Sequence, residues 1–184
     1  IQGEGGVNIP ASDYLARVRQ WCNSQNLLLI LDEVQTGMGR LGTLFGYQQY
    51  GVEPDVIALA KGLGGGVPIG AFLSKDWCMA LKPGDHGSTF GGNALTTAAA
   101  YAASKYIIDN HIAANAAAMG IHLIQSLEHL KSQFPFVTQI RGKGLLVALE
   151  FDNDISGHLI GLCNDEGLLL NAVKPNTIRF MPPL

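Results

Sequence analysis

The sequence predicts an α/β fold: part of a mostly parallel sheet in residues 1–103, then a connecting helix and a small α+β domain in residues 104–184. Residues 27–31 and 56–60 are short, continuously apolar runs, which is typical of strands buried on both faces of a parallel sheet. Beyond Pro135, short apolar segments alternate with glycine turns and a single helix. This change in the sequence pattern predicts the second domain.

The first part of the chain alternates helices with strands. Ser12 is a candidate N-cap for a helix whose apolar residues recur at helical spacing as far as Cys22. A strand at 27–31, a glycine-rich loop and a short helix at 45–50 follow. Turn residues precede the strand at 56–60, and a triple-glycine loop separates it from a third strand at 69–73.

Two long helices connect the two parts of the chain. The Ala-rich stretch predicts a helix over 93–110, and leucines on one face predict another over 111–134. Strands at 136–140 and 145–151 are expected to flank a tight turn at 141–144, in which Arg141 and Lys143 are turn residues rather than ligands. A helix over 156–166 ends at Gly167, and strands at 168–171 and 177–181 complete the domain.

Composition excludes several classes of protein. Hydrophobic residues make up 47% of the 184 positions and charged residues 15%, which excludes disorder. A net charge of −3 without a basic cluster argues against nucleic acid as a partner, and no apolar run is long enough to span a membrane. Three dispersed cysteines predict reduced thiols and a cytoplasmic location. The histidine spacing predicts no metal site.

Two residues whose side chains could take part in catalysis follow neighbouring strands. Asp32 comes directly after the first buried run, and Lys61 directly after the second. Ligands of open parallel sheets bind outside the carboxyl ends of the strands. The pair could be a buried structural salt bridge. Alternatively, Lys61, which is flanked by Ala60 and glycines, could present an unhindered amine to a carbonyl compound.

Several motifs in order give the sequence its family resemblance. They are DEVQTG at 32–37, AKGLGGG at 60–66, HGSTFGGN at 86–93, IQGEGG at 1–6 and IRFMPPL at 178–184. Together they closely resemble the class III aminotransferases, which are pyridoxal-phosphate (PLP) enzymes of fold type I. The runs PGDHGSTFGGN and LLLN are most similar to the acetylornithine type within that family.

The resemblance implies roles for individual residues around the cofactor. Lys61 resembles the family's Schiff-base lysine, and Asp32 the partner of the protonated pyridine nitrogen. The cofactor-binding set implied by the resemblance is Asp32, Glu33, Val34, Gln35, Lys61 and Thr89. Val34 would pack on the ring, unless it is a plain core residue, and Gln35 would donate to the phenolic oxygen. Thr89 would reach the cofactor phosphate of a neighbouring subunit, unless it and Ser88 only cap a helix.

The resemblance also implies residues that hold the substrate. Arg179 resembles the arginine that binds the substrate α-carboxylate, and Glu4 the glutamate that pairs with an active-site arginine and swings aside for a different substrate. Ser88 would lie near the substrate. Glu4 and Arg179 could instead form a purely structural salt bridge.

The implied reaction is transfer of an amino group from an ω-amino donor, N-acetylornithine or an ornithine-like compound, to 2-oxoglutarate, in a homodimer with shared active sites. A 4-aminobutyrate or ornithine aminotransferase stays an alternative, as does a non-catalytic remnant; Gln35 argues against an aminomutase. Because the chain starts at Ile1 and stops just after a predicted strand, we expect a fragment that lacks the family's N-terminal part and is inactive alone.

Overall fold

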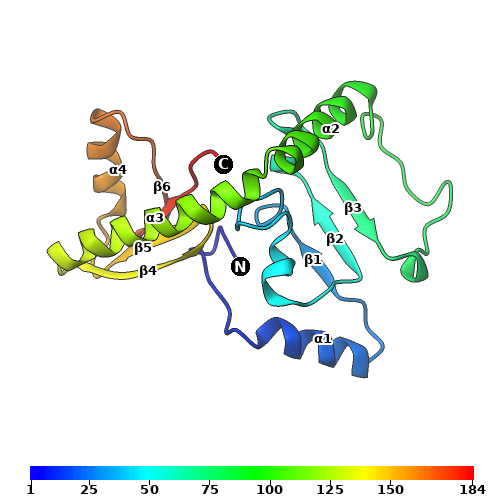
Figure 1. The fold of residues 1–184 in the computed structure, drawn as a ribbon, viewed down its shortest axis with the longest axis horizontal. Helices are drawn as coiled ribbons and strands as arrows, with labels where there is room; N and C mark the ends of the chain where they lie inside the picture. The colour runs from blue at the N-terminus through cyan, green and yellow to red at the C-terminus, as the bar shows by residue number, and fades with distance from the viewer. The chain divides into compact units, whose positions relative to one another are not determined.

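A computed structural model describes residues 1–184, which fall into two compact units (Figure 1). The β1–β3 unit consists of Ala11–Gly39 and Thr43–Ala113, and the β4–β7 unit of Ile1–Pro10, Arg40–Gly42 and Ala114–Leu184. The sequence placed the boundary at residue 103, which lies inside helix α2 (Ala94–Asp109). The whole of α2 belongs to the β1–β3 unit, because it packs against the short 3₁₀ helix η2 (Lys61–Gly64).

Strands β1 (Ile30–Asp32), β2 (Val56–Leu59) and β3 (Ala71–Ser74) form the first sheet in that order. β1 and β2 are parallel, as predicted, and their register pairs Asp32 with Ala58. β3 runs antiparallel to β2. A glycine-rich segment, in which Gly65 and Gly66 have positive φ, connects the two strands. Such a short connection suits an antiparallel neighbour, whereas a parallel one needs a long crossover.

A buried carboxylate fastens the elements at the start of β2. Asp55 Oδ2 accepts hydrogen bonds from Arg19 Nη1 of helix α1 (Tyr14–Ser24) at 2.6 Å and from the Leu29 amide at 2.7 Å. Burial alone would raise the pKa of Asp55, but the Leu29 amide, Arg19 and Lys75 together lower it below its usual value. The ionised carboxylate therefore holds α1 and the residues before β1 against β2. Two further 3₁₀ helices, η1 (Gly46–Tyr50) and η3 (Asp76–Cys78), lie in the loops of this unit.

The second sheet is antiparallel throughout, with the strand order β4-β5-β7-β6. Its elements are α3 (Ile112–Gln133), β4 (Val137–Lys143), β5 (Leu146–Phe151), α4 (Ser156–Asp165), β6 (Asn171–Lys174) and β7 (Thr177–Phe180). The turn predicted at 141–144 is shorter, because Arg141, Gly142 and Lys143 continue the β4 ladder with β5. The strand predicted at 168–171 begins only at Asn171, where pairing with β7 starts.

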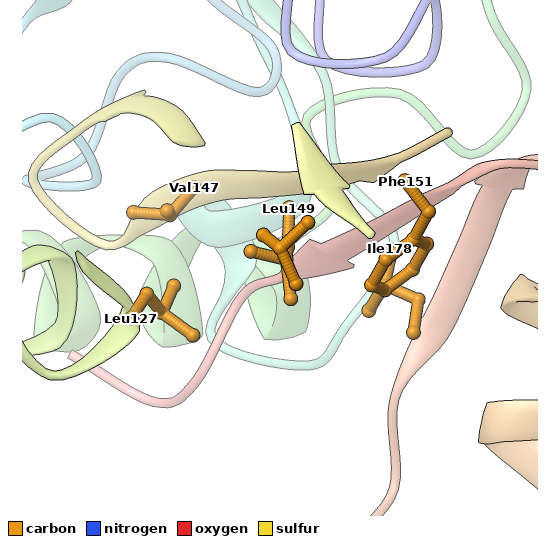
Figure 2. Close-up of a cluster of buried hydrophobic side chains, with 6 residues drawn as sticks. Leu127, Val147, Leu149, Phe151 and Ile178 are labelled. Atoms are coloured by element: carbon orange, nitrogen blue, oxygen red, sulfur yellow. The ribbon is translucent and has the colours of Figure 1, made fainter. Parts of the chain in front are cut away.

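Strand β5 is buried on both faces and separates two groups of side chains. Val147, Leu149 and Phe151 point toward Leu127 of α3 and Ile178 of β7, as Figure 2 shows. Leu146 and Ala148, on the opposite face, pack against Val7 and Leu41. Strand alternation therefore gives one face to the helices and the other to the N-terminal segment.

Helix α3 approaches the turn between β4 and β5 with no room for a side chain between them. A Cβ atom on Gly120 would overlap the carbonyl group of Gly144. On the other side of the same turn, a Cβ on Gly144 would come as close as 2.5 Å to backbone atoms of Arg40 and Leu41. Glycine is required at both positions because three backbones meet there.

We predict that Gly120→Ala destabilises the protein by about 1–3 kcal/mol, since backbone must move to admit the methyl group. Gly161→Ala is the matched control: Gly161 is also helical, in α4, and a Cβ there meets nothing within 4 Å. It should leave stability unchanged or raise it by up to about 1 kcal/mol. Urea denaturation of the complete protein measures both; equal effects of the two changes would contradict this packing.

Candidate active site

Asp32 and Lys61 lie at the same edge of the first sheet. Asp32 is the last residue of β1, and Lys61 follows the last residue of β2 by two positions on the adjacent parallel strand. Asp32 Oδ1 accepts a hydrogen bond from the Val34 amide at 2.9 Å, whereas the Lys61 side chain forms no ion pair or hydrogen bond. The two do not pair with each other, so the alternative of a structural salt bridge between them is not realised.

The backbone of Lys61 is unusual. Its φ of 46° lies in the left-handed region that non-glycine residues rarely adopt. Such strain clusters at sites where a side chain must be held in a particular direction. Here the side chain lines a hollow of about 900 Å³ between the end of β2 and the start of α2. The other lining residues are Gly66, Val67, Pro68, Ile69, Gly70, Ser88, Phe90, Gly91, Gly92, Asn93 and Thr96.

Ser88 and Thr89 precede α2 but do not cap it. The N-cap is Asn93, whose Oδ1 accepts a hydrogen bond from the Thr96 amide at 3.1 Å. Ser88 Oγ accepts from the Gly91 amide at 3.0 Å and thereby shapes the loop before the helix. Thr89 is exposed beside this loop. The alternative of a simple Ser/Thr cap is therefore not the arrangement found.

Glu33 is buried and engaged by its own unit. Its Oε2 accepts hydrogen bonds from Thr36 Oγ1 at 2.6 Å and the Gly46 amide at 2.8 Å, and its Oε1 accepts from the Tyr47 amide at 2.7 Å. Burial, and secondarily the Glu33 charge, raise the pKa of Tyr50. These contacts give Glu33 a structural role in the loop after Asp32.

We predict that Glu33→Gln destabilises the protein by about 1.5–3 kcal/mol. Both oxygens of the buried Glu33 carboxylate accept hydrogen bonds, and the NH2 group of glutamine would place a donor against one of these donors. Glu53→Gln is the matched control, since Glu53 is exposed and pairs only with Lys75 at 3.3 Å. Urea denaturation of both variants checks this. If Glu33→Gln were as harmless as the control, the buried network would not have the importance assigned to it.

A second pair of charged residues lies in the β4–β7 unit. Arg179 Nη1 donates to Glu4 Oε1 at 2.8 Å, and Nη2 donates to Asn171 Oδ1 at 2.8 Å. The Arg179 side chain is 11% exposed and that of Glu4 72%. Arg179 Nε is buried without a hydrogen-bond partner, and the residue lines a hollow of about 470 Å³ together with Asn171. The ion pair exists, but its exposed partner makes it weak.

Arg141 was expected to be a turn residue, and this expectation was wrong. It lies within β4, and its side chain donates to the carbonyl of Gly6 from Nε at 3.0 Å and from Nη2 at 2.7 Å. Its Nη1 pairs with Glu150. The one signal in the sequence was Glu150 itself, an acidic residue in the otherwise apolar run of β5 that needs a partner.

Comparison with known proteins identifies the family. The family model "Aminotransferase class-III" matches residues 1–184. The chain is 46% identical over 184 residues to an acetylornithine aminotransferase of Caldanaerobacter subterraneus subsp. tengcongensis, covering 100% of this chain and 47% of that relative. The chain thus belongs to the class III aminotransferases, and it spans about half the length of the curated relatives it matches.

Solved structures agree in fold. An acetylornithine aminotransferase from Elizabethkingia anophelis has a TM-score of 0.94 at 38% identity, with 100% of this chain and 47% of that chain covered. The ornithine aminotransferase from Toxoplasma gondii crystallized with oxidized glutathione has a TM-score of 0.94 at 41% identity, with 100% and 44% covered, and is described with partial occupancy of PLP at its active site. The predicted fold type is confirmed.

Pyridoxal phosphate is the cofactor that this membership implies, and the residues present fit it. An aldehyde needs an amine without a competing partner, which Lys61 provides. A ring nitrogen needs a carboxylate that retains accepting capacity, and the one protein contact of Asp32 is to Oδ1. The hollow beside Lys61 offers the room.

Two further observations concern a metal site and a membrane-spanning helix. No group of three or more His, Cys, Asp or Glu side chains is arranged to hold a metal ion. None of the helices combines the length and the apolar character that crossing a bilayer requires.

Proposed function

We propose that the complete protein containing this chain transfers the ω-amino group of N-acetylornithine, or an ornithine-like donor, to 2-oxoglutarate, giving a semialdehyde and glutamate. The observation that carries this proposal is the placement of Asp32 and Lys61. They are a carboxylate and an amine on adjacent parallel strand ends, and they are not paired with each other. Family membership supplies the reaction class, and the acetylornithine aminotransferases among the relatives favour this donor.

Asp32 and Lys61 would each control a different proton. Pyridoxal phosphate, when bound, supplies an electron-withdrawing ring that stabilises negative charge developing beside the amino group. The Asp32 carboxylate would keep a proton on the ring nitrogen. Lys61 Nζ would hold the cofactor by its aldehyde carbon, with water leaving as that bond forms. Once the substrate amino group takes its place there, the freed amine would take a proton from the carbon that bears this amino group, which is the ω-carbon of the donor and Cα of glutamate. The glycines after Lys61 leave its amine room to move.

The remaining predicted residues would hold the cofactor and the substrate in place. Val34 would pack on the ring, and Gln35 would donate to the phenolic oxygen. Thr89 would bind the phosphate of the cofactor in the neighbouring subunit, so the active enzyme would be a homodimer with shared active sites. Ser88, which lines the same hollow as Lys61, would lie near the substrate.

Glu4 and Arg179 would select between substrates. The closed pair neutralises Arg179 while an ω-amino donor reacts at its far end. When Glu4 moves aside, Arg179 can bind the α-carboxylate of glutamate or 2-oxoglutarate through two parallel hydrogen bonds. Because the Glu4 side chain is 72% exposed, it can return to water at small cost.

Location and assembly are part of the same proposal. The cysteines Cys22, Cys78 and Cys163 are all free thiols, which favours a reducing compartment, and we place the enzyme in the cytoplasm. Large apolar side chains of the first sheet, such as Ile30 and Phe72, are at least half exposed. Parallel sheets are normally covered on both faces, which supports the proposal that further protein completes this unit in the active enzyme.

A second candidate donor is ornithine itself, because ornithine aminotransferases are among the similar solved structures. Assays of the complete protein with N-acetylornithine, ornithine and 4-aminobutyrate, each with 2-oxoglutarate, distinguish the candidates. A preference for N-acetylornithine supports the proposal. A preference for one of the others reassigns the donor within the family, and no turnover with any of them favours the non-catalytic alternative.

We predict that Lys61 carries the cofactor. Incubation of the complete protein with pyridoxal phosphate, borohydride reduction and peptide mass mapping should find a phosphopyridoxyl group on Lys61. Lys61→Ala should abolish both the adduct and the activity, whereas Lys105→Ala, which removes an exposed lysine paired with Asp109, should change neither. A folded protein without an adduct on Lys61 would sink the enzyme proposal.

We predict that the Asp32→Asn variant still binds the cofactor but has a much lower kcat. The amide has the shape of the carboxylate but cannot hold a positive charge on the ring nitrogen, so kcat should fall on the order of a hundredfold or more. Asp76→Asn, a change at an exposed aspartate in η3, is the control. The borohydride adduct on Lys61 should persist in Asp32→Asn. A wild-type kcat in this variant would exclude the assigned role.

A further inference from the structure

The N-terminal glycine-rich turn lies across the face of the second sheet that the helices do not cover. Gln2 and Asn8 pair as an isolated bridge, and the Gly6 and Val7 amides both donate to the Gly3 carbonyl. Val7 is completely buried against Leu146 and Ala148. Glu4, which pairs with Arg179, belongs to this turn. The position of Glu4 therefore depends on what holds the turn.

The sheet presents two arginines to this turn. The register pairs Arg141 of β4 with Ala148 of β5, and Ala148 with Arg179 of β7. Directly paired residues point to the same face of a sheet, so the two arginines stand on either side of Ala148. Val7 packs on Ala148, Glu4 contacts Arg179, and the carbonyl of Gly6 contacts Arg141.

The turn is strained and needs an anchor. Val7 has a φ of 55°, which is rare for a β-branched residue, and Gly6 has a φ of 107°. A conformation of this kind persists only where its surroundings enforce it. The Gly6 carbonyl accepts two hydrogen bonds from the one guanidinium of Arg141, at 3.0 and 2.7 Å. The same guanidinium is fixed by Glu150 and by Gln139 at 2.9 Å.

We infer that Arg141 is a positioning residue for substrate selection: it fixes the glycine-rich turn so that Glu4 closes on Arg179. This inference rests on the proposed function. The contacts by which Arg141 holds the turn are stronger than the contact between Glu4 and Arg179. The Arg141 side chain is 11% exposed and its charged contacts are mostly shielded, whereas Glu4 is largely in water. Glu4 can therefore leave Arg179 while the turn stays in place, and it returns to the same position.

The test compares the two half-reactions of the complete enzyme. Without Arg141 the turn should loosen and Glu4 should pair less often with Arg179. The ω-amino donor depends on the closed pair, whereas glutamate needs Arg179 open. In Arg141→Met, the ratio of kcat/KM for N-acetylornithine to kcat/KM for glutamate should fall about tenfold. Arg141→Lys should shift the ratio in the same direction by less, because an ammonium cannot hold both Gly6 and Glu150 in the same geometry.

Two further measurements distinguish positioning from mere stabilisation. Glu4→Gln should shift the ratio in the same direction, and adding Arg141→Met to Glu4→Gln should shift it no further, because Arg141 acts through Glu4. Hydrogen exchange of the Val7 and Asn8 amides should quicken in Arg141→Met and Arg141→Lys. Arg17→Met, at an exposed arginine of α1, is the control that should leave ratio and exchange unchanged.

Each contrary outcome identifies what has failed. An unchanged ratio, an equal loss in both half-reactions, additive effects of Glu4→Gln and Arg141→Met, or unchanged exchange in the turn would overturn the role of Arg141 and leave the proposed function standing. A wild-type enzyme without activity toward either donor would overturn the proposed function, and this inference with it.

Discussion

The parallel pairing of β1 with β2 is the constraint on which the candidate active site depends. It places Asp32 and Lys61 at one edge of the sheet, where an antiparallel pair would have sent them to opposite ends. Pairing alone would not keep the two groups available for chemistry. The loop after Asp32 is held by the carboxylate of Glu33, which accepts three hydrogen bonds, so the loop makes little demand on Asp32. The two adjacent carboxylates therefore differ in role: that of Glu33 is buried and holds the loop, whereas that of Asp32 is exposed and available to a ligand.

The second sheet holds an exposed side chain, that of Glu4, next to a largely buried one, that of Arg179. Strand β5 gives its large residues to the helices and keeps small Ala148 on the other face. A larger residue there would lift the N-terminal turn away from the sheet. With alanine, Val7 can lie on the strand between Arg141 and Arg179. Strand alternation, which first serves the hydrophobic core, therefore also sets the spacing of the two arginines.

Much of this arrangement was predictable from the sequence, and what was not has a common cause. Continuous apolar runs gave the parallel pair, and the polar residues that end those runs gave Asp32 and Lys61. Helices α2 and α3 begin and end within about a residue of their predicted limits, because Asn93 and the alanine and leucine spacing mark them clearly. The contacts of Glu33 and Arg141 with backbone groups were not predicted. Both side chains bind backbone groups brought close only by folding, and such contacts leave no periodic pattern in a sequence.

The two ion pairs of the β4–β7 unit differ in a way that fits the proposed selection between substrates, in which Glu4 would move and Arg141 would not. Exposed pairs contribute about 0–1 kcal/mol, so water can replace Arg179 as the partner of Glu4 with little loss. Arg141 is in the opposite situation, since its guanidinium pairs with Glu150 and also donates two hydrogen bonds to Gly6 in a strained turn. In the proposed selection between substrates, the side chain of Glu4 would move while its backbone stayed in place. A carboxylate substrate would then have only a weak contact to displace at Arg179.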